Sequence, residues 1–75
     1  MNKARRNELS AILVLIEEAR ERLGAVRDEE QEAFDNMPES LHYSERGEIM
    51  EEYISTMDEF LDYLDTDDLQ NIVEG

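Results

Sequence analysis

The chain has 75 residues, no cysteine and one histidine, so it can form one domain at most and offers no disulfide or thiolate metal site. Its 7 basic and 21 acidic side chains give a formal charge of -14. That charge excludes direct binding to nucleic acid or to an anionic membrane, because both need a basic surface. We therefore expect a single domain over residues 1–75 and a cationic partner.

The negative charge is divided unevenly along the chain. Residues 1–43 carry 6 basic and 10 acidic side chains, whereas residues 44–75 carry 1 and 11, so most of the net charge lies in the second half. The longest apolar run, residues 11–16, is too short to span a bilayer, and no signal-like cleavage region follows the basic start. The expected location is the cytoplasm of the host cell.

The first predicted element is a long helix over about residues 3–36. Apolar or small residues recur there in alternating steps of three and four, which is the pattern of a heptad seam. Glu30 interrupts this seam, and Gly24 lies inside the helix at a cost of roughly 1 kcal/mol relative to Ala. The predicted seam consists of Leu9, Ile12, Ile16, Ala19, Leu23, Val26, Ala33 and Met37.

Pro38 marks a break, because proline disfavours helix at the preceding residue and has no N–H to donate. Ser44 is the predicted N-cap of a second helix over about residues 44–65. A short final helix over about residues 66–74 is predicted to begin at Thr66. The predicted core positions of the second helix are Met50, Tyr53, Met57, Phe60 and Leu64, widened by Ile49, Ile54 and Leu61.

The predicted fold class is all-α, an antiparallel helical hairpin that reverses near residue 40. In that register Leu23 lies opposite Met57, and Glu30 lies opposite Met50. More apolar side chains remain than two helices can bury, and such surplus apolar surface marks a subunit contact. We therefore expect two hairpins to dimerise into a four-helix bundle. The surplus residues are Leu13, Val14, Leu15, Ile54, Leu61 and Tyr63.

The second helix carries an acidic surface that helix formation alone does not favour. Like charges four residues apart, such as those of Glu48 and Glu52, destabilise a helix by about 0.2–0.5 kcal/mol per pair. Two such helices side by side approach the charge spacing of duplex DNA. One interpretation is a surface for a basic partner, and the other is solubility. The predicted partner-binding residues are Glu48, Glu51, Glu52, Asp58, Glu59 and Asp62.

Ser44, Arg46 and Gly47 form a second candidate site, for an anion. Free N–H groups at a helix start, with a hydroxyl and a guanidinium, suit a phosphate. The neighbouring carboxylates of Glu45 and Glu48 oppose an anion. In the simpler interpretation, Ser44 caps the helix, Gly47 lets the first helix approach, and Arg46 pairs with an acidic residue near the turn.

Other acidic motifs are weak. Segments 29–35 and 48–52 contain carboxylates spaced like the Mg²⁺ ligands of all-helical nucleotide pyrophosphatases, and Glu39 with His42 imitates the Glu-x-x-His pair of di-iron bundles. Such spacings arise by chance in a chain that is more than a quarter acidic. We predict no enzyme activity, no metal and no cofactor.

The segment Glu32-Ala-Phe-Asp-Asn-Met-Pro-Glu-Ser-Leu, followed by Ser44-Glu-Arg-Gly-Glu-Ile-Met-Glu-Glu, resembles a family of small acidic helical proteins of phages and prophages of Gram-positive bacteria. The shared pattern is an aromatic-Asp-Asn-apolar-Pro-Glu-Ser turn and a Ser-Glu-Arg-Gly-Glu helix start. It covers the middle third of the chain, and Leu41-His-Tyr is less polar than the pattern. The resemblance implies a phage accessory protein that binds a host factor, and it implies no catalytic residue.

These features predict a homodimeric helical protein that binds a basic surface of a host protein. One form of such binding is mimicry of nucleic acid, which would inhibit a host defence or DNA-handling factor. An alternative is a sponge that binds a phosphate ligand or signalling nucleotide at residues 44–47. A third interpretation is a structural or assembly protein of the phage without a ligand.

Overall fold

The computed structural model describes residues 1–75 as four helices. They are α1 (Lys3–Asp35), α2 (Glu39–His42), α3 (Glu45–Tyr63) and α4 (Asp67–Glu74). Since 85% of the residues are helical and none lies in a strand, the all-α prediction is confirmed. The bounds of the three longer helices lie within two residues of the predicted ones. None of the helices combines the length and apolar character needed to cross a membrane.

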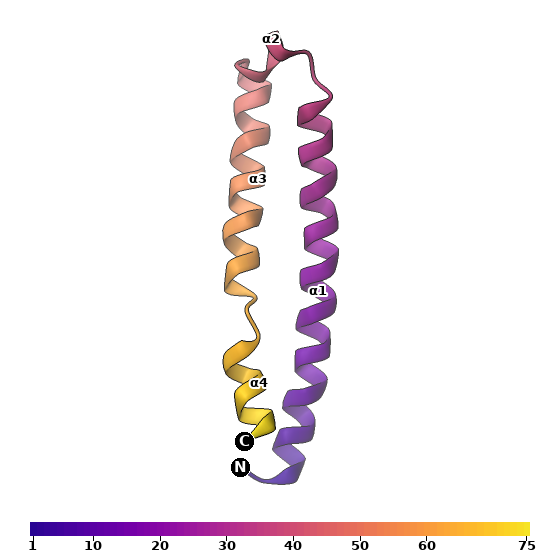
Figure 1. The fold of residues 1–75 in the computed structure, drawn as a ribbon, viewed down its shortest axis with the longest axis vertical. Helices are drawn as coiled ribbons and strands as arrows, with labels where there is room; N and C mark the ends of the chain where they lie inside the picture. Colours follow the sequence, from indigo (N-terminus) through magenta and orange to yellow (C-terminus); the bar gives the residue numbers. More distant parts are fainter.

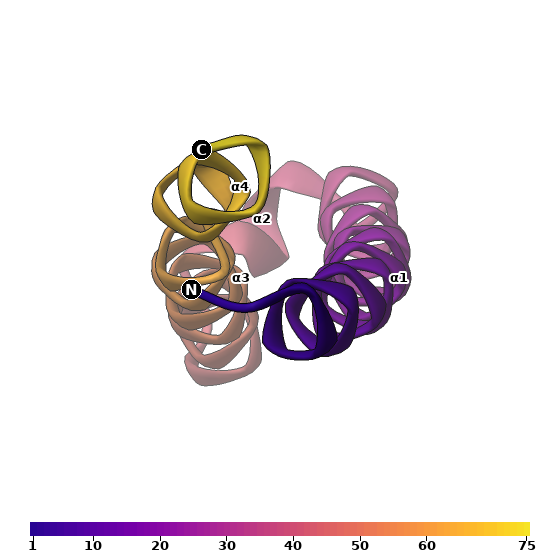
Figure 2. The same cartoon turned by 90° about the horizontal axis from the view of Figure 1, so that it is seen from below.

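The helices form two rods that lie side by side. α1 is one rod, α3 and α4 follow each other in the second, and the chain reverses at α2, so both termini lie at the same end (Figure 1). The end-on view shows α1 on one side and α3 with α4 on the other (Figure 2). The molecule measures 58 × 14 × 13 Å, and its radius of gyration is 17.5 Å, compared with about 11 Å for a compact chain of this length. Each rod therefore has one neighbour.

Polar side chains satisfy the first N–H groups of both long helices. The side chain of Asn2 accepts a hydrogen bond from the N–H of Arg5 at 2.9 Å, and the Ser44 hydroxyl accepts one from the N–H of Gly47 at 3.2 Å. The Ser44 hydroxyl also donates to the carbonyl of Leu41 at 2.5 Å, which ties α2 to the start of α3. The prediction that Ser44 is an N-cap is confirmed.

We expect Ser44→Ala to lower the free energy of unfolding by about 1 kcal/mol, because the N–H of Gly47 loses its acceptor. Urea denaturation followed by circular dichroism at one fixed protein concentration measures the loss. Ser40→Ala is the matched control, since Ser40 is exposed and its side chain makes no hydrogen bond. Equal stability of the two variants would contradict the capping role.

The predicted capping role of Thr66 is wrong. Thr66 occupies the position before α4, but its side chain makes no capping hydrogen bond. The carboxylate of Asp65 accepts from the N–H of Asp67 at 3.0 Å instead. Thr66 has φ -103° and ψ 0°, in the helical region, whereas a capping side chain normally needs an extended backbone.

The core is a narrow line between the two rods. The buried apolar side chains are Leu13, Met50 and Ile54. The prediction that Tyr53 and Phe60 belong to this core is wrong, because their exposed fractions are 59% and 55%. The inward-facing residues of α3 and its C-cap are instead spaced by alternating steps of four and three and comprise Met50, Ile54, Met57, Leu61 and Leu64.

The predicted seam of α1 is only half correct. Leu9, Ile16 and Leu23 are partly buried against the second rod, but Val26 and Ala33 are exposed, as is Ala19. The inward face is rotated so that it includes Leu13, Arg27 and Phe34. The physical reason is side-chain size, because a buried Leu or Phe removes far more apolar surface from water than an Ala does.

The register between the rods also differs from the predicted one. Arg27 contacts Asp58, whereas the predicted register places it near Tyr53, so α3 is displaced by roughly five residues along α1. The reversal is therefore centred between residues 42 and 43, at the end of α2, and not near residue 40.

Six apolar residues were expected to be more than two helices can bury. Of these, Leu13 and Ile54 are buried and Leu61 is partly buried. The remaining three, Val14, Leu15 and Tyr63, are exposed.

Candidate functional site

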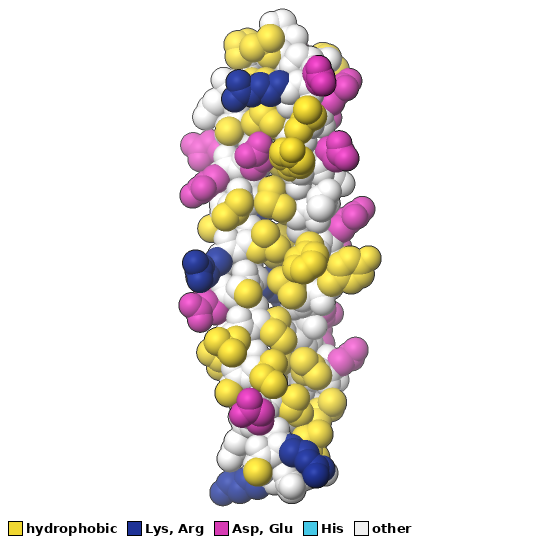
Figure 3. Space-filling view, turned by 180° about the vertical axis from the view of Figure 1, so that it is seen from behind, with side chains coloured by type: hydrophobic (Ala, Val, Ile, Leu, Met, Phe, Trp, Pro, Cys, Tyr) yellow, Lys and Arg dark blue, Asp and Glu magenta, His cyan; other side chains and the backbone are white.

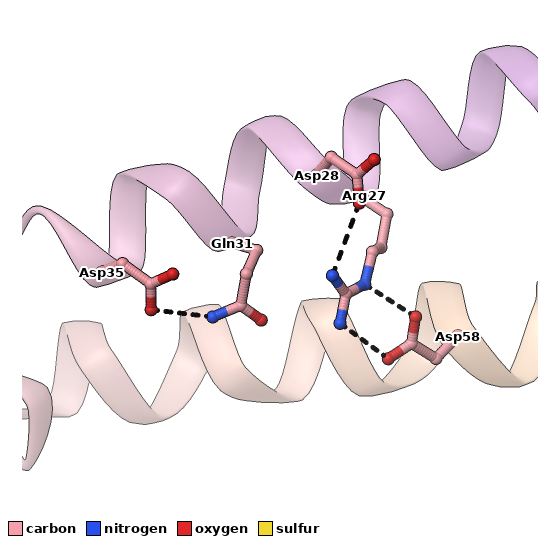
Figure 4. A network of polar contacts seen from close by, with 5 residues as sticks. All are labelled: Arg27, Asp28, Gln31, Asp35 and Asp58. Atoms are coloured by element: carbon pink, nitrogen blue, oxygen red, sulfur yellow. Dashed lines mark hydrogen bonds and ion pairs between the residues drawn. The ribbon is translucent and has the colours of Figure 1, made fainter.

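One polar link joins the two rods. Nε and a terminal nitrogen of Arg27 in α1 donate to the two carboxylate oxygens of Asp58 in α3, at 2.8 and 3.3 Å (Figure 4). A weaker contact of 3.5 Å joins Arg27 to Asp28. The hydrogen bond with Asp58 raises the pKa of Arg27 above its ordinary value, so this guanidinium stays charged. Asp58, one of the predicted partner-binding residues, therefore already has a basic partner.

The six predicted partner-binding residues are all exposed. At 100° per residue they fall on one side of α3, away from Tyr53 and Phe60. Glu51 and Asp58 lie at the edge next to α1, and the others extend from there over the outer surface of the helix. We call this set the acidic face, and it consists of Glu48, Glu51, Glu52, Asp58, Glu59 and Asp62.

Few carboxylates of this protein form an ion pair with a basic side chain of the same chain. Both ion pairs of the structure involve Arg27, so of the 21 acidic side chains only Asp28 and Asp58 contact a basic one. The other five residues of the acidic face make no hydrogen bond and no ion pair with another side chain. The acidic face therefore keeps most of its charge available to an external cation.

A shallow hollow of about 210 Å³ lies where the acidic face meets α1. Its apolar lining comes from Phe34 and Ile54, and carboxylates of Glu51 and Asp58 lie at its rim. The side-chain amide of the neighbouring Gln31 donates to Asp35 at 2.9 Å (Figure 4). An apolar floor below carboxylates is chemically suited to a lysine or arginine side chain, which has an aliphatic stem and a charged end.

α1 also contributes to this surface, which was not predicted from the sequence. Gln31 and Phe34 line the hollow, and Asp28 and Asp35 are exposed beside it. A signal for them exists in the sequence, because Glu21, Asp28 and Asp35 recur every seven residues and therefore share one side of a helix. This spacing indicates a contribution to the surface only when the inward face of α1 is correctly assigned.

The three residues of the candidate anion site have different surroundings. Ser44 and Gly47 are joined by the capping hydrogen bond, and Gly47 is buried against α2. Arg46 is exposed and forms no ion pair, so its expected pairing with Asp35, Glu39 or Glu45 does not occur. Gly47 accommodates α2 and not the first helix, since a Cβ there would meet the carbonyls of Leu41 and His42.

His42 packs against the end of α1. Its ring stacks on that of Phe34 with centroids 4.4 Å apart and planes inclined by 20°. No group of three or more His, Asp or Glu side chains is placed to hold a metal ion, and this applies to Glu39 with His42 and to the carboxylates of segments 29–35 and 48–52.

Comparisons of the chain with protein-family models, with curated proteins and with solved structures find no match. The functional conclusion therefore depends on the surface itself.

Proposed function

We propose that this protein is a non-enzymatic binding protein whose acidic face docks onto a basic surface of another protein. The observation that supports the proposal most directly is the shortage of internal partners, since only Asp28 and Asp58 of the 21 acidic side chains contact a basic one. Unpaired like charges held on one surface repel each other and weaken folding. A basic partner would relieve that repulsion. Its opposite charge would also increase the association rate and the specificity of binding.

The protein unit in this proposal is a helical hairpin that dimerises into a four-helix bundle. Its setting is a phage-infected cell, as suggested by the resemblance of the turn and of the start of α3 to small acidic helical proteins of phages and prophages. Because the carboxylates of the acidic face run along α3, a helix of 19 residues and so about 28 Å long, the partner we favour is a protein whose basic groove normally holds nucleic acid. The protein would then act as a nucleic-acid mimic that inhibits a host defence or DNA-handling factor.

The hollow beside α1 gives this docking a specific anchor. A partner's lysine or arginine could lay its stem on Phe34 and Ile54 and bring its charge to Glu51. Asp58 would contribute less, because Arg27 already occupies its oxygens. Glu51 is thus the residue of the acidic face with the largest expected share of binding.

We expect replacement of Glu48, Glu51, Glu52 and Glu59 by Gln to weaken capture of the partner by about tenfold or more, because exposed ion pairs are lost together. The tagged protein is used for capture from host lysate at low and high salt, and the basic protein recovered is then purified and titrated directly. Binding should weaken as salt increases. Asp58 is left intact so that the Arg27 link survives.

The matched control replaces Glu8, Glu18, Glu32 and Glu39 by Gln, which removes the same charge from outside the acidic face. It should retain nearly full binding. Equal loss in the two variants would show a general charge effect, and recovery of no basic protein at low salt would refute the proposal.

A further inference from the structure

α3 carries a second row of residues at helical spacing, on a side that faces neither α1 nor the acidic face. Its members follow one another in steps of four and three, and none is acidic in a helix whose remaining surface is mostly acidic. They are Ile49, Tyr53, Thr56, Phe60 and Tyr63, all of them exposed.

α1 has a corresponding row. Five of its seven positions are apolar, namely Ile12, Leu15, Ala19, Val26 and Ala33, of which Ile12 is partly buried and the others are exposed. The other two positions, at the same spacing, are the exposed charged residues Arg22 and Glu29. These include the positions of the predicted seam that do not face the second rod. A helix with two apolar rows about a quarter turn apart is typical of a four-helix bundle, in which each helix contacts two neighbours.

Both rows lie on the same side of the molecule. Val26 directly precedes the inward-facing Arg27, and Tyr53 directly precedes the inward-facing Ile54. In two antiparallel helices, residues that precede inward positions project to the same side of the pair. Figure 3 shows such a side, where hydrophobic side chains run along the length of the molecule over both rods. We call the two rows together the apolar stripe.

The protein exposes more surface than a compact chain of its size, and the excess is large enough for an interface over the apolar stripe. The accessible surface is 5926 Å², whereas a folded monomer of 8.8 kDa exposes about 4,800 Å². The difference of about 1,100 Å² exceeds the roughly 800 Å² that each partner buries in a standard protein interface.

We infer that a second copy of this chain covers the apolar stripe, with the two-fold axis parallel to the rods, so that α1 of each copy packs on α3 of the other. The inference rests on the dimer in the proposed function and is independent of the partner of the acidic face. Every helix then has two antiparallel neighbours, and the acidic faces of both copies remain exposed.

Side-chain size favours this axis over one perpendicular to the rods. The row of α3 is bulky, with Tyr53 and Phe60, whereas the row of α1 at the same height is small, with Val26 and Ala33. An axis parallel to the rods places the bulky row of one copy on the small row of the other, which permits even packing along both contacts. A perpendicular axis would pack each rod on the same rod of the other copy, reversed end to end, so that Tyr53 and Phe60 would not lie on Val26 and Ala33.

Charge favours the same arrangement. Residues 1–43 contain six of the seven basic side chains, whereas residues 44–75 contain one basic and 11 acidic side chains. A perpendicular axis would pack α3 against α3 and bring the most acidic segments of both copies together. The axis parallel to the rods separates them and gives each α3 two α1 neighbours.

The first test is the mass in solution. Sedimentation equilibrium of the full chain should give twice 8.8 kDa. Phe60→Glu, and separately Val26→Glu on the other rod, should each yield a monomer and retain helical content, since both side chains are exposed within one copy. Ser55→Glu adds the same charge outside the stripe and should remain a dimer. A monomeric parent protein would overturn both the dimer and this inference.

The second test is the direction of the axis. Because the chain has no cysteine, Ser40→Cys creates one site per copy for a spin label, at the α2 end of the molecule. An axis parallel to the rods places both labels at the same end, within about 30 Å, since neighbouring helices are about 8–10 Å apart. A distance approaching the 58 Å length of the molecule would overturn this inference and leave both the dimer and the acidic-face proposal standing.

Discussion

Gly47→Ala is expected to destabilise the protein by about 1–3 kcal/mol, whereas the same substitution at Gly24 is expected to stabilise it by roughly 1 kcal/mol. At Gly47 a Cβ would lie 2.7 Å from the carbonyl oxygen of Leu41 and would also collide with the carbonyl of His42. Both obstacles are backbone atoms, which cannot rotate away as a side chain can. At Gly24, apart from the neighbouring residues and backbone of its own helix, no atom lies within 4 Å of the added methyl group.

Urea denaturation of both variants at one protein concentration measures the two changes. The two changes in the free energy of unfolding should have opposite signs, because Ala favours helix over Gly at both positions and only the space around the added methyl group differs. If Gly47→Ala were as stable as the parent protein, α2 would not pack on α3 as the structure shows. Gly24→Ala is the internal control for the gain in helix propensity.

The glycine pair illustrates what the sequence could and could not predict. The helix bounds were predictable because Pro38, Ser44 and the spacing of apolar residues act locally. The register was not, because it depends on how the chain reverses at α2, where Gly47 packs closely against the carbonyls of Leu41 and His42. With apolar residues every three or four positions, the rods also match almost equally well after sliding by one heptad.

The rotation of α1 was mispredicted for a different reason. The regular pattern through Ile12, Ile16, Leu23 and Val26 combines two rows that serve two surfaces. Ile16 and Leu23 face the second rod, whereas Val26 lies on the apolar stripe. A single sequence cannot separate the rows, because periodicity reports which residues are apolar and not which neighbour each one meets.

The acidic face was predictable as a set of residues but not as a surface. Helical spacing alone places Glu48, Glu52 and Glu59 on one side of α3. The hollow beside them depends on Phe34 and Gln31 of the other rod, and so on the register. The contact between Arg27 and Asp58 depends on the register in the same way. Asp58 was therefore predicted to bind an external partner, although Arg27 of the same chain already contacts it.

The second large effect is expected from three consecutive residues of α1, each of which reports on a different surface. Leu13→Ala should lower the free energy of unfolding by about 2–5 kcal/mol, because Leu13 is 4% exposed. A domain of this size has little stability in reserve, so this variant should lose its cooperative unfolding transition near room temperature. Circular dichroism during a thermal scan measures the loss.

Val14→Ala and Leu15→Ala are the controls, since these side chains are 62% and 64% exposed within one copy. Val14 lies on neither apolar surface, so its replacement should change stability by no more than about 0.5 kcal/mol. Leu15 lies on the apolar stripe, so its replacement should weaken dimerisation by about tenfold and preserve helical content. Equal effects at all three positions would contradict the division of α1 into an inward face, a solvent face and a contact for the second copy, because that division gives each of the three side chains a different neighbour.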